Sequence, residues 1–164
     1  MIALLYVSLA VFTSYLIIIG VLFGWLPSIS QSYYEFSDRW GNKASWAFTI
    51  ALWGFAIPFM IAGIDMSAGS PYQWLMFLAP AGICFTGAAP QFKKGMEDKV
   101  HYIGAVSGIV LGMLGLGLIF HAYYAIIGAV VAIGSMQLLK VNNKTYWIEV
   151  IAFYTIILTL ILKA

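Results

Sequence analysis

Long apolar runs alternate with short charged gaps along this chain, and no other feature restricts its possible folds as strongly. Twelve of the fourteen charged side chains lie in or beside the first, third and fifth gaps between these runs, and only Asp65 and Lys163 lie elsewhere. Basic loops that all face one side of a bilayer are typical of a polytopic membrane protein. The pattern therefore predicts a class and an orientation, but it does not identify a substrate.

Composition supports this class. The chain is 63% hydrophobic and 9% charged, which is far from the composition of soluble domains. Its 164 residues suffice for one compact bundle, so we expect a single transmembrane domain over 1–164. The net charge of +2 is small and the basic residues lie at predicted membrane edges, so we expect contacts with membrane lipids and no nucleic-acid partner.

Six segments are long and apolar enough to be considered as spans, because a helix needs roughly 20 apolar residues to cross about 30 Å of hydrocarbon. The fourth and fifth form one apolar stretch that we divide near Phe120 and His121, where polar and aromatic residues cluster. The fold class is therefore all-α, a bundle of six transmembrane helices. The predicted spans are Ile2–Leu26, Trp46–Ile64, Pro71–Ala89, Lys99–Phe120, Ala122–Leu139 and Tyr146–Leu162.

The basic residues predict the orientation of these spans. Seven of the eight Lys and Arg residues lie in the odd-numbered gaps, and Lys163 is the exception. The positive-inside rule places these gaps in the cytoplasm and both termini outside, in the inner or another cellular membrane.

The first gap is also predicted to contain a short interfacial helix. Ser32 and Glu35 form a capping box that would open a helix over Tyr33–Trp40, which Gly41 would end. Its aromatic residues share one face, as suits a helix lying in the membrane interface. A second capping box, at Ser70 with Pro71 at the first helical position, predicts the start of the third span.

His101 and Asp98 are the candidate catalytic residues, because an imidazole three residues after a carboxylate can act in acid–base chemistry. The alternative is that Asp98 caps the helix and His101 lies at headgroup level. His121 is about 30 Å from His101 if the span between them is continuous, so the two cannot share a metal ion. With the single Cys84 in another span, we expect no metal site and no cofactor.

Three further features have both a functional and a structural interpretation. Glu149 lies inside the last span and is a functional candidate by default, although it is close enough to the surface to reach Lys144. Pro58 and Pro80 interrupt neighbouring spans, so they are either ordinary helix prolines or the walls of a midplane cavity. A row of glycines spaced by four favours close helix packing within the chain, or a homodimer; its members are Gly104, Gly108 and Gly112.

The segment Leu26-Pro27-Ser28-Ile29-Ser30 after the first span resembles the Pro-x-Ile-Ser element of the DRAM and GPI-remodelling six-span proteins. His101, followed by Gly104 and Ala105, is similar to a histidine in their later helices. The resemblance covers about a quarter of the chain and implies a six-span membrane protein connected with lipids.

Three functions remain open from the sequence. The leading one is a non-enzymatic membrane protein whose cytoplasmic face contacts lipid headgroups or a membrane partner through Tyr33, Trp40, Lys93, Lys94 and Lys99. The second is a small-solute or ion transporter that uses Pro58, Pro80 and Glu149. The third is an intramembrane lipid-modifying enzyme that uses Asp98 and His101, with Asp38 nearby.

Overall fold

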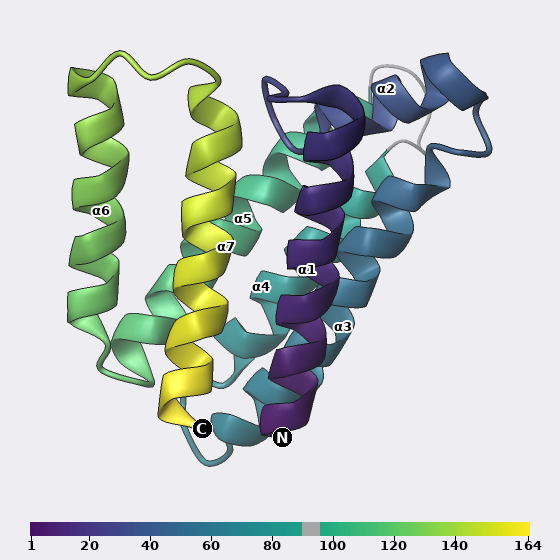
Figure 1. Cartoon of the computed structure of the whole chain (residues 1–164). Coiled ribbons are helices and arrows are strands. Elements are labelled where there is room, and N and C mark those ends of the chain that lie inside the picture. Colours follow the sequence, from purple (N-terminus) through teal and green to yellow (C-terminus); the bar gives the residue numbers. More distant parts are fainter. Residues whose placement is uncertain (90–95) are drawn as a thin grey trace.

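The computed structural model describes residues 1–89 and 96–164, except for the side chains of Glu97, Asp98 and Gln137. In these residues the fold is all-helical (Figure 1). The helices are α1 (Ile2–Phe23), α2 (Gln31–Trp40), α3 (Trp46–Met66), α4 (Trp74–Ala88), α5 (Glu97–Leu118), α6 (Tyr123–Leu138) and α7 (Lys144–Lys163). Four of them, α1, α3, α5 and α7, are long and apolar enough to cross a membrane.

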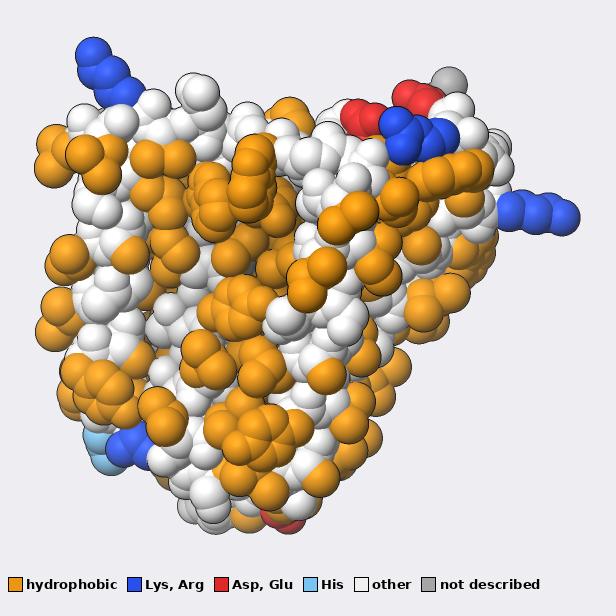
Figure 2. Space-filling view, in the orientation of Figure 1, with side chains coloured by type: hydrophobic (Ala, Val, Ile, Leu, Met, Phe, Trp, Pro, Cys, Tyr) orange, Lys and Arg blue, Asp and Glu red, His pale blue; other side chains and the backbone are white. Residues whose placement is uncertain are grey.

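The helices run up and down, and both termini lie at one end of the bundle (Figure 1). The other end holds α2 and the turn between α6 and α7; we call it the charged end. It carries Arg39 and Lys43 in and after α2, Lys99 in the first turn of α5, and Lys140 and Lys144 around the turn into α7. Hydrophobic side chains cover most of the face shown in Figure 2 below this end.

An aromatic cluster joins the first, third and last helices in the core. Phe12 of α1 lies with its ring centroid 5.0 Å from Phe55 of α3 and 5.4 Å from Phe153 of α7. Phe55 and Phe153 are themselves 5.5 Å apart. Rings at these separations add to the packing energy of the apolar surface that they bury. This cluster fixes α1 between α3 and α7.

Several predicted boundaries agree with the structure. The break between α5 and α6 falls at His121, whose positive φ of 50° lies in the turn. Gly41 ends α2 with φ 83°, and its N–H donates to the Ser37 carbonyl at 2.8 Å. A left-handed conformation of this kind favours glycine because it has no Cβ.

Both capping boxes were wrong. The helix α2 begins at Gln31, two residues before the predicted Tyr33, and Ser32 is buried inside it. The segment from Pro71 to Gln73 is a turn, and α4 begins only at Trp74. Ser70 Oγ accepts from the Tyr72 N–H at 3.2 Å, but the Gln73 side-chain amide donates to the Ile64 carbonyl at 2.8 Å and does not turn back to Ser70, so the reciprocal bond of a capping box is not made.

Candidate functional site

The short helix α2 is held at the charged end by aromatic contacts. Phe36 is buried and lies 5.0 Å from the Phe23 ring of α1 and 5.7 Å from Trp40. Tyr33 packs edge-on to Phe48 of α3 at 6.3 Å. The guanidinium of Arg39 lies 5.2 Å from the Phe23 ring, and its Nη1 donates to the Leu22 carbonyl at 3.1 Å. One face of α2 is therefore fixed to the bundle, while Trp40 stays half exposed.

The loop between α1 and α2 is bound to the start of α7 and to Asn143, the residue before it, by three hydrogen bonds, which we call the loop latch. Asn143 Nδ2 donates to the Trp25 carbonyl at 2.8 Å, and the Tyr146 N–H donates to the Pro27 carbonyl at 3.1 Å. The Ile29 N–H donates to Glu149 Oε2 at 2.7 Å. A short bond between an amide and a carboxylate belongs to the stronger class of protein hydrogen bonds.

This placement gives Glu149 a structural role that sequence reasoning did not assign. Its carboxylate accepts a backbone N–H from a residue 120 positions earlier in the chain. The hydrogen bond from that amide offsets part of the cost of placing an acidic side chain inside an apolar helix. The transporter alternative based on this residue stays a prediction.

Two buried hydroxyl groups form a chain of hydrogen bonds to Ile29, the residue whose N–H contacts Glu149 in the loop latch. Ser32 Oγ donates to the Ile29 carbonyl at 2.5 Å, and Tyr15 Oη lies 2.6 Å from Ser32 Oγ. Because Ser32 has one proton, and it goes to Ile29, Tyr15 is the donor to Ser32. Sequence reasoning gave Ser32 a different role, as a helix cap, and missed Tyr15, although a tyrosine within the apolar run that precedes a serine-rich loop is a usable signal.

The candidate acid–base residues are only partly described. His101 is half-buried on α5, with its ring centroid 6.3 Å from Phe48. The side chain of Asp98 lies outside the described residues, and so do Lys93 and Lys94. Lys99 is exposed at the charged end. The enzyme hypothesis therefore stays a prediction.

The described residues hold no group of three His, Cys, Asp or Glu side chains arranged for a metal ion. His121 lies in the turn between α5 and α6, at the opposite end of the bundle from the start of α5.

The glycine row on α5 faces other helices of the same chain. A Cβ built on Gly104 would lie 2.7 Å from the Gly82 carbonyl oxygen of α4, and one on Gly108 would lie 3.2 Å from the Ala79 oxygen. Gly112 faces Ile156 of α7. The absent side chains let α4 and α5 approach at backbone distance. A homodimer through this row stays a prediction.

Pro58 and Pro80 lie within α3 and α4, which continue through them. Neither residue lines the grooves described below. The two helices are also linked by polar contacts, since Thr49 Oγ1 donates to the Gly87 carbonyl at 2.7 Å and Trp53 Nε1 to the Cys84 carbonyl at 3.0 Å.

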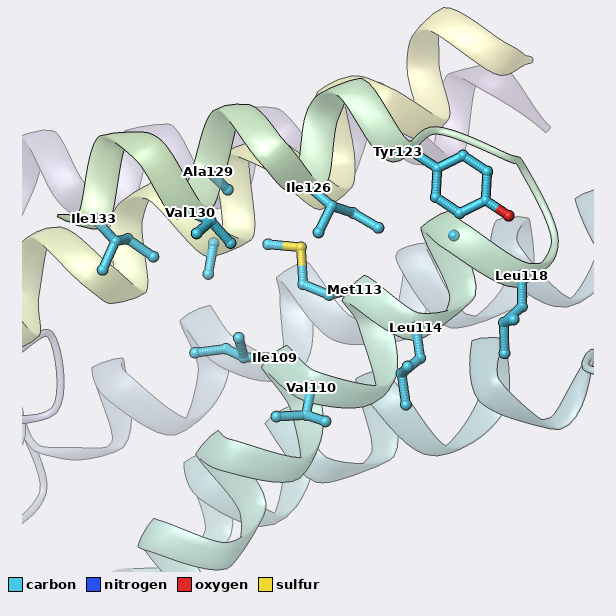
Figure 3. A pocket seen from close by; sticks show the side chains of 12 residues that line it. Ile109, Val110, Met113, Leu114, Leu118, Tyr123, Ile126, Ala129, Val130 and Ile133 are labelled. Carbon is cyan, nitrogen blue, oxygen red and sulfur yellow. The ribbon is translucent and has the colours of Figure 1, made fainter. Parts of the chain in front are cut away.

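Among the grooves that α7 helps to line in the described part of the chain, two matter here. The first, of about 450 Å³, lies between α5 and α6, and side chains of both helices face it, including Ile109, Met113, Ile126 and Ile133 (Figure 3). Its lining is apolar, so it suits apolar groups. The second, also about 450 Å³, lies between α1 and α7 and reaches the charged end at Trp25 and Trp147. This α1/α7 groove adjoins the loop latch, because Tyr146 belongs to both.

Comparisons of the chain with protein families, characterised proteins and solved structures found no match. The likeness to the DRAM and GPI-remodelling proteins stays an expectation that rests on Pro27–Ser30 and His101.

Proposed function

We propose that this protein is an integral membrane protein of six spans whose charged end binds the headgroups of anionic lipids. The observation that supports the proposal is the combination, at one end of an apolar bundle, of exposed cations, half-exposed aromatic side chains and an interfacial helix. Phosphate-bearing lipids offer these cations a complementary charge. Tyrosine and tryptophan favour the level of the headgroups.

The span count extends the four long helices by two shorter ones. The helices α4 and α6 have 15 and 16 residues. At about 1.5 Å per residue they are roughly 22 to 24 Å long, which is below the 30 Å of an average hydrocarbon core. A short span is accommodated by local thinning of the bilayer at modest cost. The alternating direction of neighbouring helices in Figure 1 supports six crossings.

The orientation follows from the charges. Cytoplasmic loops carry an excess of Lys and Arg, so the charged end would face the cytoplasm and both termini the other side. The headgroups concerned are then those of the cytoplasmic leaflet, whose surface carries the anionic lipids.

The proposed binding of anionic lipids is tested by removing exposed cations from the charged end. Lys43, Lys99 and Lys140 are exposed at the charged end, and replacing all three by alanine removes three charges without removing a described contact. Lys163, exposed at the opposite end, is the matched control. We expect native mass spectrometry of the purified protein, given equal phosphatidylglycerol and phosphatidylcholine, to show a preference for the anionic lipid.

The triple variant should lose this preference, and Lys163→Ala should keep it. Equal retention of both lipids by the unchanged protein would show the proposal to be wrong. The same substitution at Lys93 and Lys94 tests their predicted contribution to the surface.

A further inference from the structure

The α1/α7 groove runs along the surface between α1 and α7, and small residues leave space in part of its wall. Gly20 of α1 lies in its wall, and a Cβ built on Gly20 would meet no atom within 4 Å. Trp25 and Trp147 stand at its charged end with ring centroids 5.1 Å apart. Ile17 and Val21 contribute exposed aliphatic side chains to the same wall. The groove is therefore aliphatic along the α1 wall from Ile17 to Val21 and aromatic at its charged end.

Its depth corresponds to one leaflet of a bilayer. Thr13 at the deep end and Val21 near the mouth are eight residues apart on α1. Eight residues of helix cover about 12 Å, and half of a 30 Å hydrocarbon core is about 15 Å. The deep end thus falls near the middle of the membrane. An occupant with one polar end must place that end at the mouth.

The two hydroxyls at the deep end are paired with each other. Thr13 Oγ1 and Tyr154 Oη are 2.8 Å apart, and both residues line the groove. A hydroxyl that already has a partner does not require a polar group from an occupant. The deep part of the groove therefore accepts a hydrocarbon chain.

Two cations lie at the charged end next to the ends of the helices that form the groove, Arg39 from α2 and Lys144 from α7 itself. Arg39 Nη1 donates to the carbonyl of Leu22, the residue after Val21, which holds the guanidinium at the end of α1. Lys144 opens α7 one turn before Trp147. Their charge complements that of a phosphate placed between them.

We propose that the α1/α7 groove binds one acyl chain of an anionic phospholipid from the leaflet at the charged end, with the phosphate between Arg39 and Lys144. This inference rests on the proposed function and gives it a specific site. The acyl chain lies against Ile17, Gly20 and Val21, and the tryptophans enclose the glycerol region. The charged end as a whole contacts many lipids, whereas the groove binds one lipid per protein molecule.

The test fills the groove while leaving the cations in place. Gly20→Leu puts a side chain into space that the structure shows to be empty, and leucine has a higher helix propensity than glycine. Ile17→Trp enlarges an exposed side chain of the same wall. Gly134→Leu is the matched control, since a Cβ on Gly134 of α6 also meets nothing within 4 Å and Gly134 does not line this groove.

The measurement is native mass spectrometry of the whole protein with phosphatidylglycerol at increasing detergent concentration. We expect one tightly retained lipid, whose retention falls about tenfold in Gly20→Leu and Ile17→Trp, or 1.4 kcal/mol, and is unchanged in Gly134→Leu. Circular dichroism of each variant checks the helical fold.

If both groove variants retain the lipid as the unchanged protein does, the groove assignment is wrong while the proposed function stands. If the unchanged protein shows no preference for the anionic lipid, both the groove assignment and the proposed function are wrong. Equal loss in Gly134→Leu, or the mass of a second polypeptide in place of the lipid, also overturns the assignment.

Discussion

The contact between α4 and α5 predicts that an alanine at Gly104 destabilises the fold although alanine favours helices. A Cβ at this position would lie 2.7 Å from the Gly82 oxygen, 2.7 Å from Thr86 Oγ1 and 2.9 Å from Thr86 N. Two of these three atoms belong to the backbone of α4, so a rotamer change cannot relieve the overlap. The two helices would have to separate.

The magnitude follows from two opposing terms. Overfilling a packed interface costs about 1 to 3 kcal/mol. Replacing glycine by alanine within a helix gains about 1 kcal/mol. Gly134→Ala on α6 has the second term alone, because nothing lies within 4 Å of its added Cβ. The difference between the two variants therefore isolates the steric term, and we expect it to be about 1 to 3 kcal/mol.

The assay is equilibrium unfolding of the purified protein in mixed micelles, with the free energy of unfolding measured for both variants and for Gly82→Ala. A Cβ at Gly82 would lie 2.8 Å from the Gly104 oxygen, so the two interface variants should be similarly destabilised. The reasoning is refuted if Gly104→Ala and Gly134→Ala have the same free energy of unfolding.

Three further predictions concern the loop latch and the topology. Glu149→Ala should lower the free energy of unfolding by about 1 to 3 kcal/mol, because it leaves the Ile29 N–H unpaired. Glu149→Gln retains an acceptor for that N–H and should lower the free energy of unfolding by less. Hydrogen exchange at the Ile29 amide distinguishes the two variants. Ser32→Ala leaves the Tyr15 hydroxyl without its partner, whereas the Ile29 carbonyl keeps the bond from the Ser32 N–H at 3.2 Å. One buried hydroxyl without a partner should cost about 1 to 3 kcal/mol, and a thermal midpoint equal to that of the unchanged protein would contradict this. In a chain that carries Cys84→Ser, the single substitutions Lys43→Cys and Ser70→Cys should react with an impermeant maleimide from opposite sides of the membrane. Labelling of both cysteines from the same side would contradict the six-span arrangement.

Helix number and approximate boundaries could be predicted from the sequence because they depend on local properties. Apolar length and the position of charges are read directly from neighbouring residues, and His121 marks the turn between α5 and α6 as expected. The capping boxes failed because they depend on a competition that the pattern does not record. Ser32 has a better partner in the Ile29 carbonyl and Tyr15 than in the helix end that it would have capped.

The candidate site was less predictable because its contacts join distant parts of the chain. The sequence identifies Glu149 as an unusual acidic residue within a span, but not the Ile29 amide that it binds. Likewise, Thr13 and Tyr154 are 141 positions apart, and only the packing of α1 against α7 brings their hydroxyls together. Burial makes such pairs necessary, since an unpaired polar group in hydrocarbon is costly, but it does not specify the partner.

The same long-range contacts constrain when the charged end can assemble. All three bonds of the loop latch join the segment from Trp25 to Ile29 with residues of the last helix or the residue before it. The groove has one wall from α1 and one from α7, so it too is absent until the final span is in place. A chain truncated before Lys144 would keep the residues that join α2 to α1 and α3, because none of them belongs to the last helix. It would lack the acceptor for the Ile29 amide and one wall of the α1/α7 groove. Lipid retention should therefore depend on the last helix even though most of the exposed cations precede it.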